Sequence, residues 1–133
     1  MRFFGAKIGV DTRIHPTVMI TVPWNLFIGD RVGIGDSVTL YSLGQITIGD
    51  NATISQNAHI CAGTHDYEDI SFPLLKPPIY IGESAWVAAD AFIGPDTKIG
   101  AGAIVAARSV VVRDVEERVI VAGNPASVVR SRD

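Results

Sequence analysis

A period of six residues constrains this chain more than any other feature. Fifteen positions of one repeating pattern all hold Ile, Leu or Val, and only three gaps are needed to keep the pattern in phase: 8, 14, 20, 28, 34, 40, 48, 54, 60, 81, 87, 93, 99, 105 and 111. Four residues after each of them stands a small or β-branched residue, with Trp24 as the exception, and Gly directly follows seven of them. A unit of six residues has room for one short strand and one corner, but not for a hairpin or a helix.

Three such units close one triangular coil, and stacked coils pair each strand in parallel with its copy in the next coil. The period therefore predicts an all-β fold, a single-stranded parallel β-helix of about five coils. Residue usage agrees, because Ile and Val together number 31 and Leu only 5, and β-branched residues favour extended chain. The glycines that follow the aliphatic residues are expected to ease the bend at each corner.

The gaps in the pattern predict where the solenoid is interrupted. Two extra residues follow the first and second coils and fifteen follow the third, so all three insertions leave from the same corner. We expect one domain over residues 1–133, with an extruded loop at 64–80 and a capping segment at 113–133. In that segment, Asn124-Pro125 favours a short helix and Val128-Val129 favours an edge strand; either would cover the open end. At the other end Phe3, Phe4 and Ala6 lack cover, which indicates a partner or a missing N-terminal segment.

Composition excludes several classes of protein. The chain of 133 residues is 47% hydrophobic and 19% charged with a net charge of −3, which is too apolar for a disordered chain and gives no basic footprint for nucleic acid. No apolar run approaches about 18 residues, so we expect no membrane span and no secretory signal, and a cytoplasmic location. Cys61 is the one cysteine, which excludes an internal disulfide and zinc sites that need two thiolates.

Longer stretches of the sequence resemble the hexapeptide-repeat acyltransferases over essentially the whole chain. The stretches run from Ile48-Gly49-Asp50-Asn51 to His65-Asp66, from Ile81-Gly82 to Ala107-Arg108-Ser109, and over Ala122-Gly123-Asn124-Pro125-Ala126. Pro23-Trp24-Asn25-Leu26 and Cys61-Ala62-Gly63-Thr64-His65-Asp66-Tyr67 are most similar to colanic-acid-type acetyltransferases, with galactoside and maltose O-acetyltransferases as cousins.

The resemblance implies a left-handed β-helix that assembles as a homotrimer, with active sites between subunits. It implies transfer of an acetyl group from acetyl-coenzyme A (acetyl-CoA) to a hydroxyl of a sugar or polysaccharide precursor, without a metal. Members of the family usually carry a longer segment before the stretch that resembles Phe3-Phe4-Gly5-Ala6-Lys7-Ile8-Gly9, so the resemblance also implies a short or truncated N-terminus.

His65 is the residue predicted to carry the chemistry. Moving an acetyl group from a thioester to a hydroxyl needs a base, and imidazole titrates near neutral pH. His65 opens the loop of the third coil, where the family has its catalytic histidine, so the resemblance assigns it the role of general base. Asp66 either orients His65 or is a solvated loop acid. His59 and His15 are expected to be structural.

The remaining site residues follow from the resemblance alone. Ala89 and Ala107 match positions whose backbone binds the pantetheine arm of coenzyme A. Arg113 and Arg130 match positions where basic residues meet the nucleotide phosphates, the alternative being a solvated C-terminus. Ser37, beside Asp36, stands where the cousins carry an acceptor-binding asparagine, which leaves the acceptor open.

Two other functions compete with acetyl transfer. A zinc enzyme of the γ-carbonic-anhydrase type uses the same solenoid with three histidines around a shared metal. This chain has three histidines in all, His15 lies several coils from the other two, and the spacing from His59 to His65 is six rather than the five expected for that ligand pair. The other alternative is a structural trimer without catalytic activity.

Overall fold

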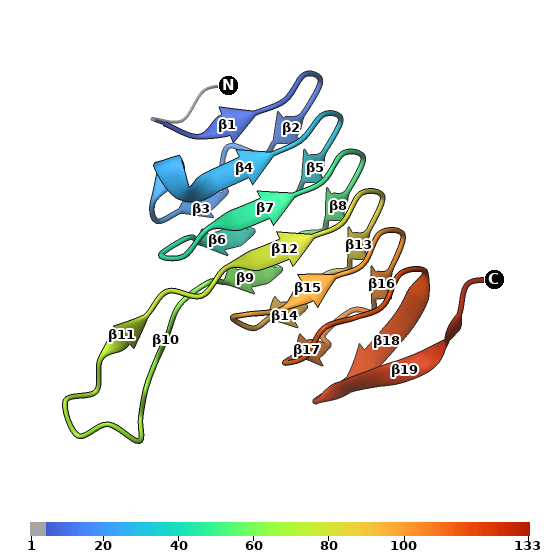
Figure 1. Ribbon diagram of the computed structural model, residues 1–133. Coiled ribbons are helices and arrows are strands. Elements are labelled where there is room, and N and C mark those ends of the chain that lie inside the picture. The colour runs from blue at the N-terminus through green and yellow to red at the C-terminus, as the bar shows by residue number, and fades with distance from the viewer. Residues whose placement is uncertain (1–4) are drawn as a thin grey trace.

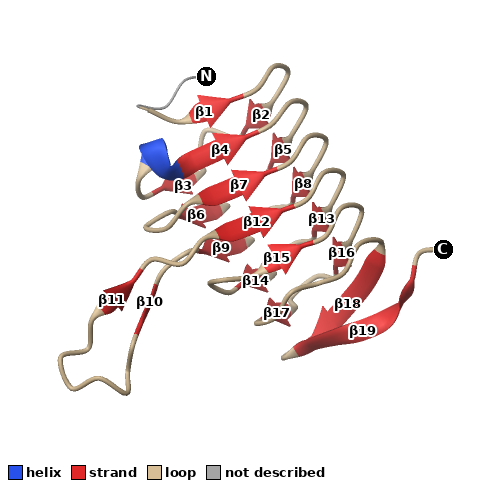
Figure 2. Ribbon diagram, in the orientation of Figure 1, coloured by secondary structure: helices blue, strands red, loops and turns tan. Residues whose placement is uncertain are grey.

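The computed structural model describes residues 5–133, which form a three-faced solenoid built almost entirely from short strands (Figures 1 and 2). Phe3 and Phe4, for which the sequence predicts no covering coil, lie outside the described residues. Within the described part of the chain, helical structure is limited to the 3-10 turn η1 (Pro23–Asn25). In residues 5–133 no helix is long and apolar enough to cross a membrane.

Each face of the solenoid is one sheet. The first face consists of β1 (Lys7–Ile8), β4 (Leu26–Ile28), β7 (Ile46–Ile48), β12 (Ile79–Ile81) and β15 (Lys98–Ile99). The second face consists of β2 (Arg13–Ile14), β5 (Gly33–Ile34), β8 (Thr53–Ile54), β13 (Trp86–Val87), β16 (Ile104–Val105), β18 (Val119–Gly123) and β19 (Ala126–Ser131). The third face consists of β3 (Met19–Ile20), β6 (Thr39–Tyr41), β9 (His59–Cys61), β14 (Phe92–Ile93) and β17 (Val110–Val111). We call the edge between the first and second faces the first corner, that between the second and third the second corner, and that between the third and first the third corner.

The strand register confirms the six-residue period at each of its fifteen positions. On every face, the aliphatic residue of one coil pairs in parallel with the aliphatic residue of the next, as in the first-face ladder of Ile8, Ile28, Ile48, Ile81 and Ile99. The second-face ladder begins with Ile14 and Ile34, and the third-face ladder begins with Ile20 and Leu40. From the second coil onward all of these side chains are buried, whereas those of the first coil are half-buried, because no described coil covers them.

All three insertions leave the solenoid at the third corner, as the phase of the repeat predicts. The first contains η1, and the second joins β6 to β7. The longest contains the antiparallel strands β10 (Thr64–His65) and β11 (Leu74–Leu75) and projects away from the body of the solenoid (Figure 1). The connections at the other two corners keep the six-residue spacing, so the solenoid stays regular there.

The C-terminal segment ends the solenoid with an antiparallel hairpin. Val115 bridges to Ile99 and begins a partial sixth coil, which β18 continues by pairing with β16. Of the two alternatives for this segment, the structure has the edge strand: β19 follows Pro125 and pairs with β18. Buried Val115 and Val121, with half-buried Val119, thus cover the last complete coil.

The glycines that follow the aliphatic residues have a different role from the one expected. They do not have positive φ; the left-handed residues at the corners stand three positions after the inward residue, as Asn51, Asp90 and Arg118 do. A Cβ on Gly82 would lie 2.6 Å from the backbone nitrogen of Ala101 in the next coil. At the first corner these glycines therefore permit the coils to approach closely, rather than easing the bend.

His59 projects from the third face into an aromatic contact. Its ring centroid lies 5.3 Å from that of Phe92 and 6.4 Å from that of Tyr41, and its Nε2 is buried with no hydrogen-bond partner among the described residues. Burial lowers the pKa of His59 below its ordinary value of 6.5, since the charged imidazolium would lose its hydration. This environment suits a neutral packing residue.

A glycine-to-alanine pair tests the close stacking of coils. Gly82→Ala should destabilise the fold by about 1–3 kcal/mol, because the new methyl group meets backbone that cannot rotate away. Gly33→Ala is the matched control, since a Cβ there has nothing within 4 Å; we expect no loss, or a gain below about 1 kcal/mol. Urea unfolding followed by circular dichroism measures both. Equal losses in the two variants would contradict the close-approach explanation.

Stability should depend on pH through His59. Because its pKa is lower in the folded state, the unfolded chain binds more protons just below pH 6.5, so protonation favours unfolding. As the pH falls from about 7.5 to about 5.5, the melting temperature of the wild type should fall more steeply than that of His59→Phe, which cannot titrate. Parallel melting curves for the two proteins across this range would show that His59 does not contribute.

Candidate active site

His65 stands at the base of the projecting hairpin. Strand β10 holds it opposite Leu74 of β11, with its side chain exposed. Its Nδ1 lies 3.1 Å from the carbonyl oxygen of Phe72, and its ring stacks on the Phe72 ring with centroids 4.2 Å apart and planes at 15°. A carbonyl can only accept, so the proton of this hydrogen bond belongs to Nδ1. The Nε2 lone pair is then free to accept a proton.

Asp66 does not orient His65 in this structure. Its carboxylate accepts a hydrogen bond from the backbone amide of Glu68 at 3.1 Å, which closes a local turn. The orienting acceptor is the Phe72 carbonyl, seven residues after His65. Sequence reasoning missed Phe72, because its contact depends on how the loop folds back, and neither residue type nor spacing reveals that.

A second feature is a groove along the second corner. It is lined mainly by apolar atoms, has a volume of about 410 Å³, and is formed by Ser55, Gln56, Trp86, Ala88, Ala89, Ile104, Ala106 and Ala107. The predicted cofactor residues Ala89 and Ala107 therefore lie together in one groove. Trp86 forms part of its wall, with its indole N–H donating to the Ser55 hydroxyl at 2.9 Å. Trp86 is not among the predicted site residues, although a large aromatic directly before the inward Val87 must face outward and was a usable signal in the sequence.

The backbone at this corner leaves donors available. Among residues 5–133, the amides of Ala89 and Ala107 donate no hydrogen bond, whereas the carbonyl of Ala89 accepts from Arg108 at 2.9 Å. The two alanines occupy the same position of adjacent coils, two residues after the inward Val87 and Val105. Both residues line the groove, and their backbone N–H groups are hydrogen-bond donors that no acceptor in the described chain uses.

The two predicted arginines lie in different places. Arg130 pairs with Ile120, and Ile120 pairs with Ile104 of the groove. Arg130 therefore ends a row of residues that runs along the second face from Trp86 toward the C-terminal end of the solenoid. Arg113 follows β17 and lies at the third corner, off this row. Both side chains are exposed.

Asp36 and Ser37 lie at the second corner, as the groove does, but in a coil nearer the N-terminal end of the solenoid. The Asp36 carboxylate accepts hydrogen bonds from the hydroxyls of Thr17 and Ser37, which lower its pKa below the ordinary value. His15 Nδ1 lies 3.7 Å from the same carboxylate. A backbone hydrogen bond links this corner to the next coil, since the amide of Asn57 donates to the carbonyl of Asp36.

The structure does not bring all the predicted residues together within one chain. Ala89, Ala107, Asp36 and Ser37 share the second corner, whereas the hairpin with His65 leaves from the third corner. These corners are opposite edges of the third face (Figure 1). Among the described residues, no group of three His, Cys, Asp or Glu side chains is placed to hold a metal ion.

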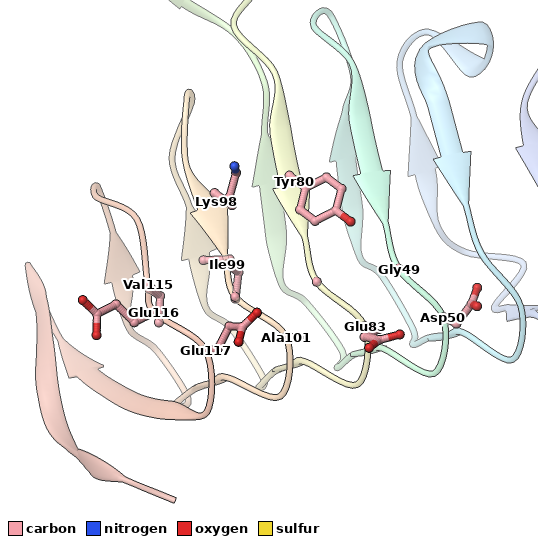
Figure 3. Close-up of a pocket in the computed structure, with 12 residues that line it drawn as sticks. Gly49, Asp50, Tyr80, Glu83, Lys98, Ile99, Ala101, Val115, Glu116 and Glu117 are labelled. Atoms are coloured by element: carbon pink, nitrogen blue, oxygen red, sulfur yellow. The ribbon is translucent and has the colours of Figure 1, made fainter.

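A larger groove of about 740 Å³ runs along the first corner (Figure 3). Its side chains include Tyr80 and Lys98, but its rim carries four carboxylates, from Asp50, Glu83, Glu116 and Glu117. This concentration of negative charge opposes a ligand that carries phosphates. The smaller alanine groove of the second corner lacks these carboxylates and is the better candidate for a phosphorylated cofactor.

Comparison with known proteins agrees with the fold and with the repeat. Residues 78–113 match the family model "Bacterial transferase hexapeptide (six repeats)". The chain is 47% identical over 132 residues to the "Putative colanic acid biosynthesis acetyltransferase WcaF" of Escherichia coli (strain K12), covering 99% of this chain and 72% of that protein. It is 29% identical over 128 residues to the galactoside O-acetyltransferase of the same strain, covering 94% of this chain and 63% of that protein.

Solved structures agree as well. The hexapeptide-repeat acetyltransferase VCA0836 from Vibrio cholerae superposes with a TM-score of 0.90 at 29% identity, covering 97% of this chain and 74% of that one. The same protein in complex with acetyl-CoA gives a TM-score of 0.79 at 27% identity, covering 94% of this chain and 70% of that one. The expected left-handed parallel β-helix is confirmed. Through its identity to WcaF over nearly its whole length, and through a six-residue repeat paired in register on three faces, the chain belongs to the hexapeptide-repeat acetyltransferases.

Proposed function

We propose that this protein transfers the acetyl group of acetyl-CoA to a hydroxyl of a sugar or polysaccharide precursor, with His65 as the general base. The observation that carries the proposal is the alanine groove, in which two amides of adjacent coils have no acceptor among the described residues. Two comparisons support it: VCA0836 has been crystallised with acetyl-CoA, and WcaF is assigned to the synthesis of a polysaccharide, colanic acid.

The groove suits the pantetheine arm of coenzyme A. The arm carries two amide carbonyls, which the N–H groups of Ala89 and Ala107 would bind, and its aliphatic parts would pack on Trp86 and Ile104. Arg130, at the end of the same row, would pair with the nucleotide phosphates through charge-assisted hydrogen bonds. Arg113 lies at the third corner, so it would reach a nucleotide held in the groove of a neighbouring protomer.

His65 would act while the acceptor attacks. Its Nε2 removes the hydroxyl proton as the acceptor oxygen bonds to the thioester carbonyl carbon. The carbon–sulfur bond then breaks, the acetyl ester is released, and the proton passes to the departing thiolate of coenzyme A. The Phe72 carbonyl, already bonded to Nδ1–H, stabilises the transient imidazolium. Asp36 and Ser37 would bind acceptor hydroxyls; Ser37 in place of asparagine leaves the identity of the sugar open.

A complete site needs more than one chain. His65 and the groove belong to opposite edges of the third face, so we propose that the His65 hairpin of one protomer meets the groove of the next. Such a contact joins different surfaces of two copies, and a rotation of one third of a turn between copies closes it into the parallel homotrimer that we propose.

Paired substitutions at the two corners test which groove holds the cofactor. Ala107→Leu should weaken acetyl-CoA binding at least about 10-fold, because the larger side chain fills the groove and screens the amide. Ala101→Leu is the matched control, since Ala101 occupies the same repeat position at the first corner. Isothermal titration calorimetry measures both affinities. A larger loss of acetyl-CoA affinity in the Ala101 variant would show that the cofactor binds in the acidic groove of the first corner instead.

Removing the imidazole tests the chemistry. His65→Ala should lower turnover by roughly 10² to 10⁴-fold, whereas affinity for coenzyme A should stay nearly unchanged, because a general base acts in the transition state. Thiol release with a panel of sugars measures turnover, and light scattering checks the oligomeric state. His59→Phe provides a control histidine and should retain activity. If His65→Ala kept more than about a tenth of the turnover as an intact trimer, another group would be the base.

A further inference from the structure

We infer that Phe72 is a positioning residue for His65: its carbonyl selects the imidazole tautomer and its ring fixes the imidazole plane. This inference rests on the proposed role of His65 as the base. Phe72 does not touch the reacting atoms in this scheme, and it acts through His65.

One residue supplies two different restraints on the same ring. The hydrogen bond of 3.1 Å from Nδ1 directs one edge of the imidazole toward the Phe72 carbonyl. The near-parallel stack, with centroids 4.2 Å apart, fixes the plane of the ring. His65 is exposed, and an exposed side chain without such contacts would exchange between rotamers. Together the two contacts hold Nε2 in one direction.

The backbone of Phe72 is specialised for this arrangement. Its φ is 51°, in the left-handed region, which is unfavourable for a bulky residue. Every other non-glycine residue with positive φ in the described chain lies at a coil corner, where the regular solenoid imposes that conformation. Phe72 lies in the projecting loop, far from any such constraint, so its conformation needs a local cause.

That local cause is a turn closed by Asp69. The amide of Phe72 donates to the Asp69 carbonyl at 2.8 Å, and the Asp69 carboxylate accepts the amide of Ser71 at 2.9 Å and its hydroxyl at 2.8 Å. The two hydrogen bonds from Ser71 lower the pKa of the Asp69 carboxyl below its ordinary value. With the Phe72 amide held in place, rotation about φ would carry the carbonyl and the ring away from His65 together. The left-handed conformation is therefore what permits both contacts.

Both contacts become stronger when His65 takes a proton. A hydrogen bond from an imidazolium is charge-assisted, and a phenyl face attracts a cation more than a neutral ring. The gain therefore appears in the transition state, while the proton is moving, and contributes little to cofactor binding. Loss of Phe72 should lower kcat and leave the KM for acetyl-CoA unchanged.

Three substitutions separate the ring from the carbonyl. Phe72→Gly deletes the ring but accepts positive φ, so the carbonyl can stay; kcat should fall roughly 2- to 10-fold. Phe72→Pro fixes φ near −65° and removes the amide that bonds Asp69, so both contacts are lost; kcat should fall roughly 10- to 100-fold. Phe72→Tyr keeps both contacts, so its kcat should stay within about 2-fold of that of the wild type. Tyr67→Ala, at another exposed aromatic of the same loop, is the matched control and should leave kcat unchanged.

Nitrogen-15 NMR of histidine-labelled full-length protein measures the tautomer without any substrate. We expect His65 to carry its proton on Nδ1 in the wild type and in Phe72→Gly, and to shift toward the Nε2–H form in Phe72→Pro. A wild-type His65 with its proton on Nε2 would overturn the inference, as would a kcat within 2-fold of the wild type in both Phe72→Gly and Phe72→Pro. His65→Ala distinguishes the two levels: full activity in that variant refutes the proposed function, whereas its inactivity beside fully active Phe72 variants refutes only the role of Phe72.

Discussion

Parallel pairing of each coil with the next sets the register of the whole solenoid. Each inward Ile, Leu or Val lies directly above its equivalent, so backbone hydrogen bonds and aliphatic stacking enforce the same register on all three faces. A slip of one residue on any face would turn the aliphatic row outward and break the ladder. The positions of the corners, and therefore of every groove, follow from this register.

Because the register is fixed, residues at equivalent repeat positions form columns along the corners, and their chemistry decides what each corner can bind. At the first corner the column carries glycine, which lets the coils approach closely, and carboxylates, which give that groove a negative rim. At the second corner the positions that match Glu83 and Ala101 are held by Ala89 and Ala107, and the groove there is lined mainly by apolar atoms. One solenoid thus presents two grooves that differ in charge, and we propose the second, which lacks the carboxylate rim, as the cofactor site.

The proposed base lies outside this regular lattice. His65 stands on a projecting hairpin at the third corner, and its orientation depends on a short chain of local contacts: the Asp69 turn, the left-handed Phe72, and the Phe72 carbonyl on Nδ1. The solenoid positions the insertion at the third corner, and contacts within the insertion orient the His65 side chain. The distance between the hairpin and the alanine groove along the third face explains why we propose that neighbouring protomers share a site.

The six-residue period alone predicts the parallel solenoid, the register of its strands and the corner from which the insertions leave, because these features depend on spacing along the chain and not on side-chain contacts. It also identified the alanines of the groove by resemblance, since equivalent positions stay equivalent in a regular lattice. Three features become visible in the folded chain alone: Phe72 rather than Asp66 contacts the His65 imidazole, the glycines permit close approach of the coils rather than the bend, and the C-terminal segment ends in an edge strand. These features depend on how non-repeating segments fold back and on atoms that meet across coils, which a periodic pattern does not encode.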